Sequence, residues 1–317
     1  EDGRIMYLET VSDSAEGVGH FEPLRHYAEV HLMLEPGERG SGLVFASDCS
    51  ENLLDINWQR LILTHLEEKT HLGVMTGSPI TDMKITLVSG RAHLKHTQGG
   101  DFREATYRAL RQGLMTLRER GKTVLLEPYY SFTLELPGEY VGRAISDITA
   151  KYGTIDEHEA NEDFSLLRGT VPVSEMGDYA NEVAAYTHGK GRLSVLVDGY
   201  YQCHNTDEIV SEYNYDPTAD IDNTPDSVFC SHGAGFIVPW YDAPSYMHLE
   251  MRKTLVSDSS PAPVPRVIES NIDIDERELE AIMEREFGPI RRPVYSDPKK
   301  PVVVNERQKK KKRSLYI

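Results

Sequence analysis

Apolar and polar residues along the first 122 positions follow strand and helix periods in turn. Residues 23–36 alternate apolar and polar side chains, which predicts a strand that leaves a glycine-rich turn at 16–23. Residues 55–73 repeat apolar side chains at helical spacing and end at a glycine, which predicts an amphipathic helix. A second long strand is predicted at 80–94.

A helix follows the second strand closely. Its predicted start has Asp101 as the N-cap, with Glu104 three residues later completing a capping box. Apolar residues then recur on one helical face as far as Gly121. Gly99 and Gly100 are therefore expected to form the hinge between strand and helix, because glycine has a backbone freedom that larger residues lack.

Residues 123–204 show a regular succession of patterns. Alternating and amphipathic segments follow one another as βαββαβ, the order of the ferredoxin-like split-βαβ sandwich. The predicted elements are a strand at 123–137, a helix at 139–153, a hairpin made of 154–160 and 163–173, a helix at 174–189 capped by Ser174, and a strand at 191–203. Together with the first 122 residues, this order predicts an α+β protein.

The character of the chain changes after residue 204. The parts that follow are a polar, acidic stretch at 205–226, an apolar segment at 227–240 that we expect to be ordered, a Pro-rich extended linker at 259–267, a short charged helix at 275–288, and a basic terminus at 306–314. We therefore expect a first domain over 1–122, a second over 123–204, and a partly ordered C-terminal extension over 205–317.

Length and charge limit the function classes. The chain has 317 residues, which suits two domains at roughly 150 residues each. Its net charge of −17 at first argues against a nucleic-acid partner. Residues 84–122, however, hold nine Lys or Arg and only three Asp or Glu, besides His93 and His96. Positive charge concentrated on one element is what phosphate contacts require, so a nucleic-acid partner remains open.

The termini and cysteines bear on location. No apolar run approaches the ~20 residues of a membrane span, and the charged start is unlike a secretory signal. The chain does not begin with Met, which is typical of a processed chain or of a piece of a longer protein. Cys49, Cys203 and Cys230 lie far apart and form no CxxC pair. We therefore expect reduced thiols in a cytoplasmic protein and no structural zinc site.

Two motifs with catalytic potential fail on inspection. The Gly-Lys-Thr at 121–123 resembles the end of a phosphate-binding P-loop, but Thr116 stands where that loop needs a glycine. A helix precedes it and a strand follows, which is the reverse of the P-loop order. Cys230 and His232 are two apart on a predicted strand and have no third group to orient them, so we expect a buried thiol beside a loop histidine.

Histidine pairs do not form a metal site on spacing alone. His65 and His71 are six apart, which places them on different faces of the predicted helix, whereas zinc ligands on a helix are four apart. We expect both to be solvated. His93 and His96 have no third ligand nearby in the sequence. Neither a metal nor a resident cofactor is therefore expected in this chain.

The segment HLKHTQGGDFRE, residues 93–104, admits three interpretations: a metal site, a phosphate-cradling loop, or an exposed tip that contacts a polyanion. The tip is favoured because a strand of about 15 residues spans on the order of 45 Å and carries its far end away from the core. A solvated loop without a partner remains the alternative. The side chains that would donate to phosphates or unstacked bases are His93, Lys95, His96, Thr97 and Gln98.

Several longer segments resemble elongation factor G and its relatives. VLLEPYYSFTLELPGEY from residue 124 and GTVPVSEMGDYANEVAAYTHGKGRLSV from residue 169 resemble the fifth domain of that family. IMYLETV at 5–11, LEP at 34–36 and DFREATYRAL at 101–110 resemble the end of the third domain and the fourth domain. The resemblance covers roughly residues 1–204.

The resemblance implies a fold and a set of partners. The first domain would be like domain 2 of ribosomal protein S5, with a left-handed βαβ crossover, and its tip loops at 17–23 and 94–100 would reach the decoding region of the small ribosomal subunit. The second domain would lie near the GTPase-associated RNA of the large subunit. The residues expected to contact ribosomal RNA are Gly19, His20, Phe21, Arg25, His93, Lys95, His96, Thr97, Gln98, Gly99 and Gly100.

The same resemblance implies an activity that this chain does not carry by itself. GTP and Mg²⁺ would bind in a preceding domain, and the full-length protein would be a ribosome-stimulated, monomeric GTPase. DFR at 101–103 and LEPYYSF at 126–132 are closest to the tetracycline-resistance ribosomal protection branch, although the tip carries His, Lys and Gly where that branch presents Pro and aromatic residues. A stand-alone protein-interaction module, or an enzyme using Cys230 and His232, remain the alternatives.

Overall fold

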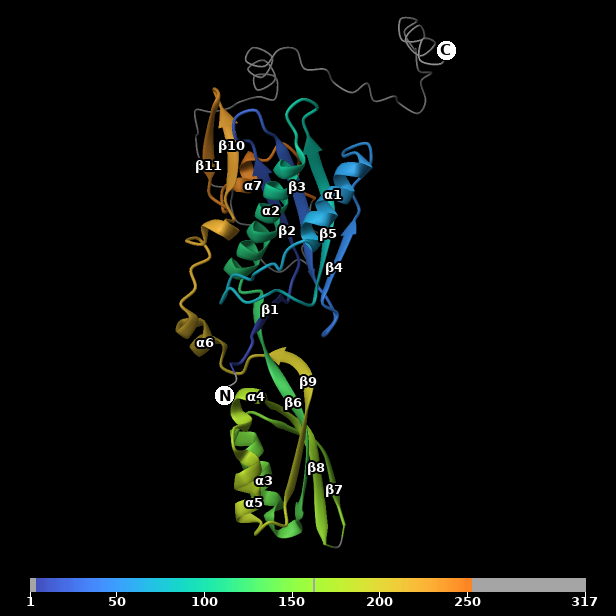
Figure 1. Cartoon of the computed structure of the whole chain (residues 1–317), viewed down its shortest axis with the longest axis vertical. Coiled ribbons are helices and arrows are strands. Elements are labelled where there is room, and N and C mark those ends of the chain that lie inside the picture. The colour runs from blue at the N-terminus through green and yellow to red at the C-terminus, as the bar shows by residue number, and fades with distance from the viewer. Residues whose placement is uncertain (1–3, 162, 253–317) are drawn as a thin grey trace, which may run out of the picture. The chain divides into compact units, whose positions relative to one another are not determined.

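The computed structural model describes residues 4–161 and 163–252, which form two β-sheets with helices (Figure 1). The α+β class predicted from the sequence is confirmed. The first sheet has the strand order β11-β10-β2-β3-β5-β4, and the second has the order β1-β6-β8-β7 with β9 on the other side of β6. The Pro-rich linker, the helix predicted at 275–288 and the basic terminus lie outside the described residues.

The centre of the first sheet is a set of three antiparallel strands. The strands β2 (Ala15–Phe21), β3 (Ala28–Pro36) and β5 (Met83–Ala92) pair in that order. Strand β4 (Leu43–Ser47) runs parallel to β5 and is connected to it through helix α1 (Ile56–Glu67). This β4-α1-β5 connection is the βαβ unit of the domain.

Helices α1 and α2 (Gly99–Glu119) lie on one face of the first sheet (Figure 1). Glycines allow the close approach of α2 to β2: a Cβ on Gly17 would lie 2.2 Å from the carbonyl oxygen of Ala109, and one on Gly19 would lie 2.1 Å from that of Ala105. The glycine-rich turn predicted at 16–23 is therefore wrong, since residues 15–21 are a buried strand. These glycines serve close packing and not backbone freedom.

The other face of the first sheet is covered by the segment that follows the second domain. The hairpin of β10 (Ser227–Ser231) and β11 (Ala234–Val238) extends the sheet next to β2, and α7 (Ala243–Tyr246) packs beside it. An apolar cluster joins these parts to β2, namely Val18, Phe229, Val238 and Ala243. The apolar segment expected at 227–240 is thus ordered, and it belongs to the first sheet.

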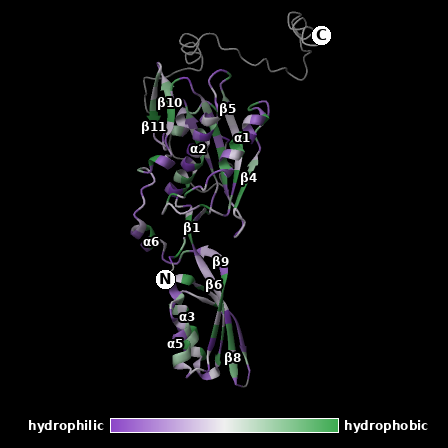
Figure 2. Ribbon diagram, viewed as in Figure 1, coloured by the Kyte–Doolittle hydropathy of each residue, from purple (hydrophilic) through white to green (hydrophobic). Residues whose placement is uncertain are grey.

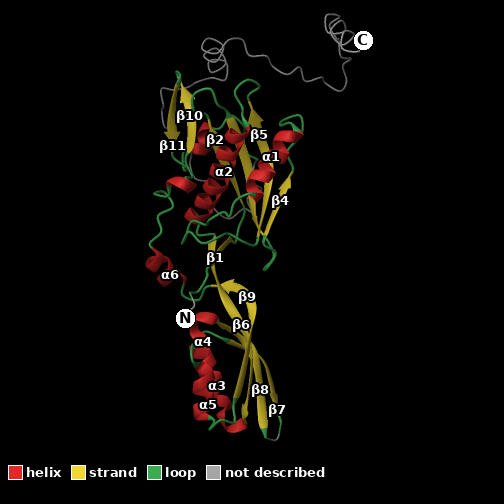
Figure 3. Ribbon diagram, in the orientation of Figure 1, coloured by secondary structure: helices red, strands yellow, loops and turns green. Residues whose placement is uncertain are grey.

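The second domain has the predicted βαββαβ order, and β6 (Thr123–Pro137) has the predicted bounds. The other elements are a 3-10 turn (Gly138–Tyr140), α3 (Val141–Ala150), β7 (Thr154–Ala160), β8 (Phe164–Pro172), α4 (Val173–Met176), α5 (Tyr179–Tyr186) and β9 (Arg192–Gln202). Strand β1 (Leu8–Val11) pairs with the start of β6. Helices α3 and α5 lie side by side on one face of this sheet (Figure 3).

One helix of the second domain differs from its prediction. The helix expected over 174–189 with Ser174 as its cap begins instead at Val173, after Pro172, and is interrupted at Gly177. Gly177 has φ +40°, a backbone conformation that favours glycine and cannot continue an α-helix. Hydrophobic and hydrophilic residues alternate along the elements of both domains (Figure 2), as expected for elements with one buried face.

The helix predicted over 55–73 is shorter than its pattern. It ends at Glu67, and the following loop folds around Glu9, whose buried carboxylate accepts the backbone N–H groups of Met75, Thr76 and Ser78 at 2.9–3.2 Å. The loop closes on this carboxylate because buried backbone donors need acceptors. Among the described residues, no helix is long and apolar enough to cross a membrane. The remaining described elements are α6 (Thr206–Tyr213) and a 3-10 turn (Ile221–Asn223).

Both histidines of that region are buried, and the expectation that they are solvated is wrong. His65 is 3% exposed, and its ring bonds to Glu68 and to the carbonyl oxygen of Gly99. His71 is 5% exposed, lies in the loop after the helix, and bonds to the carbonyl oxygen of Leu66. Since the helix had already ended, the helical spacing argument did not apply to His71.

Candidate nucleic-acid interface

Two loops of the first domain meet at one end of the sheet: residues 22–27, between β2 and β3, and residues 93–98, between β5 and α2. The hydroxyl of Thr97 joins them, because it donates to the carbonyl oxygen of Tyr27 at 2.6 Å and accepts the backbone N–H of His93 at 2.6 Å. We call these two segments the loop pair. Residues that are 70 apart in the sequence thus form one continuous surface.

The start of α2 is the base of the loop pair, and it differs from the prediction. The N-cap is Gln98, so Gly99 and Gly100 form the first turn of the helix and are not a hinge. Asp101 occupies the third helical position, where its carboxylate accepts the backbone N–H of Gln98 at 2.7 Å. The other oxygen of Asp101 pairs with Nδ1 of His26 at 2.8 Å, which ties the 22–27 loop to the helix.

The capping box is therefore one turn earlier than predicted. Glu104 takes no part in it and pairs with Arg108 further along the helix. A strand of about 15 residues was predicted to project from the core, but β5 has ten residues and remains within the sheet. The loop pair accordingly extends from the end of the sheet only by the length of its own two turns.

The loop pair presents cationic, apolar and imidazole groups together. Arg25 and Lys95 are exposed, and Arg25 has a left-handed backbone with φ +67°. Leu24 and Leu94, at the tips of the two turns, are 51% and 60% exposed, which is unusual for leucine. Sequence reasoning did not single out these leucines. Their signal was an apolar residue placed directly before a basic one in each turn, Leu24 before Arg25 and Leu94 before Lys95.

Two imidazoles of the loop pair, His93 and His96, are neutral at pH 7. His93 and His96 stack with ring centroids 4.6 Å apart. Burial and the neighbouring His96 lower the pKa of His93 to about 4, and burial with the charges of Lys95 and Arg25 lowers the pKa of His96. The positive charge of the surface therefore comes from Arg25 and Lys95, while the histidines provide hydrogen-bonding and stacking groups.

Three residues predicted for the tip lie elsewhere. Gly19 and His20 are within β2, and His20 is completely buried. Phe21 ends that strand half-buried, under the guanidinium of Arg108 at 4.9 Å. A contact between RNA and His20 would require the first sheet to open. The structure brings together the remaining predicted residues Arg25, His93, Lys95, His96, Thr97, Gln98, Gly99 and Gly100.

His20 belongs instead to a buried network of histidines and glutamates, which we call the His–Glu network. Its ring bonds through Nδ1 to Glu29 at 3.0 Å and through Nε2 to Glu22 at 2.9 Å. The ring of His31 likewise bonds to Glu16 at 2.7 Å and to the second oxygen of Glu29 at 3.1 Å. Glu22 also begins the 22–27 loop, so the network supports the loop pair from within.

Burial alone would lower the pKa of His31, but the hydrogen bonds to Glu16 and Glu29 raise it to about 9. The same two causes act on His20, where the bonds to Glu22 and Glu29 raise the pKa despite complete burial. Sequence reasoning missed this network. Its only local signal is the alternation of Glu29 and His31 on one face of β3, where a buried face usually carries apolar residues.

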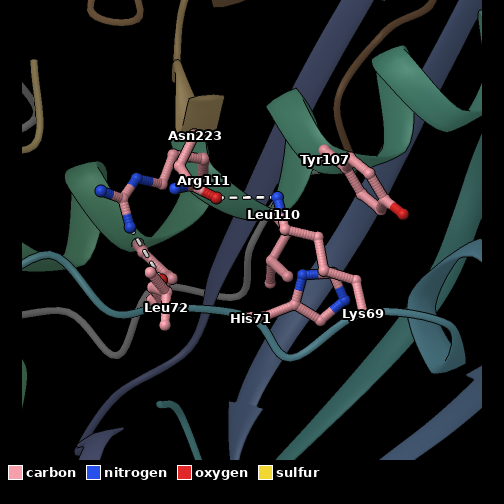
Figure 4. A pocket seen from close by; sticks show the side chains of 8 residues that line it. Lys69, His71, Leu72, Tyr107, Leu110, Arg111 and Asn223 are labelled. Carbon is pink, nitrogen blue, oxygen red and sulfur yellow. Dashed lines mark hydrogen bonds between the residues drawn. The ribbon is translucent and has the colours of Figure 1, made fainter. Parts of the chain in front are cut away.

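A small cavity between the loop that follows α1 and helix α2 cannot hold a cofactor (Figure 4). It has a volume of about 20 Å³, which suits a water molecule and not a nucleotide. Its cations already have partners: Lys69 donates to Asn223 at 2.8 Å, and Arg111 donates to the carbonyl oxygens of Leu72 and Gly73. The cavity is therefore part of the packing between the loop after α1, helix α2 and the 221–223 turn.

The cysteines carry no nucleophile. All three are free thiols, and burial raises the pKa of Cys230, Cys203 and Cys49. A thiol with a raised pKa is a poor nucleophile at pH 7. His232, the expected partner of Cys230, has φ +51° in the tight turn between β10 and β11. This geometry argues against the enzyme that uses Cys230 and His232.

The fold and the loop pair together define a class: a mixed sheet-and-helix domain with a cationic tip, followed directly by a ferredoxin-like domain, as in the C-terminal halves of translation factors. Residues 3–117 match the family model described as "Elongation factor G, domain IV", and residues 124–209 match "Elongation factor G C-terminus". The chain belongs to the elongation factor G family, as the sequence resemblance indicated.

A solved structure supports the fold. It is the crystal structure of a protein designated ttk003000868 from Thermus thermophilus, and it is similar to this chain with a TM-score of 0.58 and 25% sequence identity. The similarity covers 68% of this chain and 32% of that chain. The part that matches thus spans about a third of the length of that protein.

Proposed function

We propose that this chain is the ribosome-binding, C-terminal part of a translational GTPase, and that its loop pair contacts RNA of the small-subunit decoding region. Membership of the elongation factor G family supports the first part of the proposal. The joining of two distant loops by Thr97 is the single observation that carries the second part. It creates one surface whose groups suit RNA, on an otherwise acidic chain of net charge −17.

The groups of the loop pair divide the work of RNA recognition. Arg25 and Lys95 would pair with phosphate oxygens, which position a protein without reading sequence. The neutral imidazoles of His93 and His96 would stack on, or hydrogen-bond to, unstacked bases, as single-stranded RNA loops allow. The exposed Leu24 and Leu94 would lose water on contact with a base face or a sugar.

The rest of the proposal concerns the full-length protein. GTP and Mg²⁺ would bind in a domain that precedes this sequence, and the second domain would lie near the GTPase-associated RNA of the large subunit. The protein would act as a monomer in the cytoplasm. Segments 101–103 and 126–132 favour the ribosomal protection branch, whereas the His, Lys and Gly of the tip suit a translocase-like or ribosome-rescue role equally; a rise in tetracycline resistance on expression of the full-length protein would distinguish the first from the others.

The test is ribosome binding by the complete chain at several salt concentrations. Arg25→Ala combined with Lys95→Ala removes both exposed cations of the loop pair. If each cation contacts one phosphate, the slope of log affinity against log salt should fall by between about 1.4 and 1.8. Thermal stability should change little, because exposed substitutions usually stay within about 0.5 kcal/mol.

A matched control removes the same charge elsewhere in the first domain. Arg60→Ala combined with Lys84→Ala also deletes two exposed cations, on α1 and β5. This control should leave the salt slope close to that of the wild type. Equal slopes for the loop-pair variant and the wild type would refute the RNA contact. If both double variants lost the same amount of slope, the binding would be explained by general charge attraction and not by a contact at the loop pair.

A further inference from the structure

Three ligand-type side chains converge beneath the segment that covers the first sheet. The ring nitrogens of His20 and His248 and the carboxylate of Glu29 all lie within 4.8 Å of one another. His20 comes from β2, Glu29 from β3, and His248 from the segment after α7, so that residues from distant parts of the chain meet at one point. His20 and Glu29 are fully buried, and His248 is half-buried.

The distances suit a small tetrahedral ion. Nδ1 of His20 lies 3.0 Å from Oε2 of Glu29, and Nδ1 of His248 lies 3.8 Å from the same oxygen. Zinc bonds of about 2.0–2.2 Å with tetrahedral angles separate ligand atoms by about 3.3–3.6 Å. Shifts of a few tenths of an ångström would bring each of the two nitrogens to this separation from the Glu29 oxygen. Two imidazoles and a carboxylate are also a ligand set that zinc accepts in proteins.

A fourth possible ligand atom, the hydroxyl oxygen of Tyr27, is present at the same point. The hydroxyl of Tyr27 lies 2.8 Å from Nδ1 of His248. In the tautomer of His248 that carries its proton on Nε2, this hydroxyl donates to the lone pair of Nδ1, and a metal ion would take that lone pair in place of the hydroxyl. Tyr27, or a water in its place, could complete four-coordination.

Supporting contacts orient the three ligands. Nε2 of His20 bonds to the carboxylate of Glu22 at 2.9 Å, the arrangement in which a carboxylate fixes a metal-binding imidazole. The ring of His20 also stacks on Phe229, with centroids 4.1 Å apart and planes within 3°. The second oxygen of Glu29 is held by His31 and by the backbone N–H of Leu249.

We propose that His20, Glu29 and His248 form a site for a divalent transition-metal ion of the zinc class, which fastens residues 247–252 onto the first sheet. The sequence had indicated no metal site, because its three ligands are spread along the chain. In the metal-free protein a proton on His20 holds the same contact to Glu29, and the ion replaces this proton. The ion would then stabilise the His–Glu network that lies beneath the loop pair.

The test uses the complete chain after dialysis against EDTA, titrated with ZnCl₂ by calorimetry and followed by elemental analysis. We expect close to one zinc per chain and a rise in the melting temperature. The fluorescence of Trp58 and Trp240 gives this temperature, since both tryptophans pack on the core of the first domain. Co²⁺ in place of zinc should give the visible absorption of a tetrahedral site. Residues 253–317 contain no His or Cys, which limits background binding.

Variants distinguish a metal ligand from a structural histidine. His248→Asn should reduce zinc affinity more than about 10-fold and abolish the zinc-dependent rise in melting temperature. His204→Asn is the matched control, because His204 is also a half-buried histidine paired with a glutamate, Glu127, at 2.6 Å. It should bind zinc as the wild type does.

Three outcomes would overturn the site. They are a wild-type chain that takes up no zinc, a His248→Asn variant that binds zinc with wild-type affinity, and equal losses in the His248→Asn and His204→Asn variants. If His20→Asn fails to fold, the wild-type stoichiometry and the His248→Asn variant still decide the question. Ribosome binding is not needed for any of these measurements, so the metal site and the proposed function fail or stand separately.

Discussion

Replacing Gly19 by alanine tests the most consequential difference between the sequence-based prediction and the structure. If residues 16–23 were an exposed turn, one added methyl group would change stability by less than about 0.5 kcal/mol. In the structure, Gly19 lies in β2 beneath α2, and the added Cβ would lie 2.1 Å from the carbonyl oxygen of Ala105 and 2.4 Å from the backbone nitrogen of Ala109.

The size of the effect follows from these distances. Ordinary Cβ contacts begin at 3.4 Å, so the helix and the strand would have to separate by about 1.3 Å, the difference between 3.4 and 2.1 Å. The clashing atoms belong to the backbone and cannot rotate away. Such a shift would loosen Phe102 and Ala105, which are fully buried on the same helix. Overpacking of this kind costs about 3 kcal/mol or more.

The assay is urea unfolding followed by tryptophan fluorescence, which reports only the first domain because the chain has two tryptophans and both pack on its core. Gly100→Ala is the control, since a Cβ there meets nothing within 4 Å. It should stabilise the domain by about 0.4–1 kcal/mol, because alanine restricts the unfolded chain and suits the first turn of α2. A Gly19→Ala protein as stable as the wild type would refute the close approach of α2 to β2.

Three further predictions concern single side chains of the first domain. Asp101→Ala should cost about 1–2 kcal/mol in urea unfolding, because the N–H of Gln98 and the ring of His26 lose their acceptor, whereas Asp101→Asn should lose less. Lowering the pH from 6.5 to 4 should reduce the free energy of unfolding by no more than about 3 kcal/mol. The pKa of His93 is 6.5 in the unfolded chain and about 4 in the folded protein, so the unfolded state binds the proton more readily over this range. A His93→Gln protein with an equally steep decline would exclude this cause. Arg111→Met should cost about 2–4 kcal/mol, since it leaves two backbone carbonyls without their donor, and an unchanged unfolding midpoint would contradict the contacts seen in the structure.

The sequence alone determined those features that depend on neighbouring residues. The order βαββαβ and the bounds of β6 follow from side-chain periods of two and 3.6 residues, which are set by the geometry of strand and helix. The family resemblance likewise rested on continuous segments. The loop at 93–98 was located for the same reason, since a strand pattern ends there and a helix pattern begins.

Only the tertiary structure decided which role an ambiguous residue plays. A glycine in a sequence is equally consistent with a flexible turn and with close packing. Gly17 and Gly19 serve close packing, because α2, some 90 residues away in the chain, approaches β2 at these positions. The position of the α2 start was misjudged because Asp101 suits both the N-cap and the third helical position. In the folded protein Asp101 takes the third helical position, and there its carboxylate bonds to the ring of His26, which lies 75 residues earlier in the chain.

Burial of charge depends even more on distant segments. Glu29 and His31 alternate with apolar residues on β3, and this pattern predicts a solvated outer face of the sheet. The chain instead returns after the second domain. The ring of Phe229 stacks on His20, and the backbone N–H groups of His248 and Leu249 bond to Glu29 at 3.0 and 2.8 Å. Buried charges remain stable only when such partners are supplied, and here the partners lie about 220 residues away, where no local pattern can reveal them.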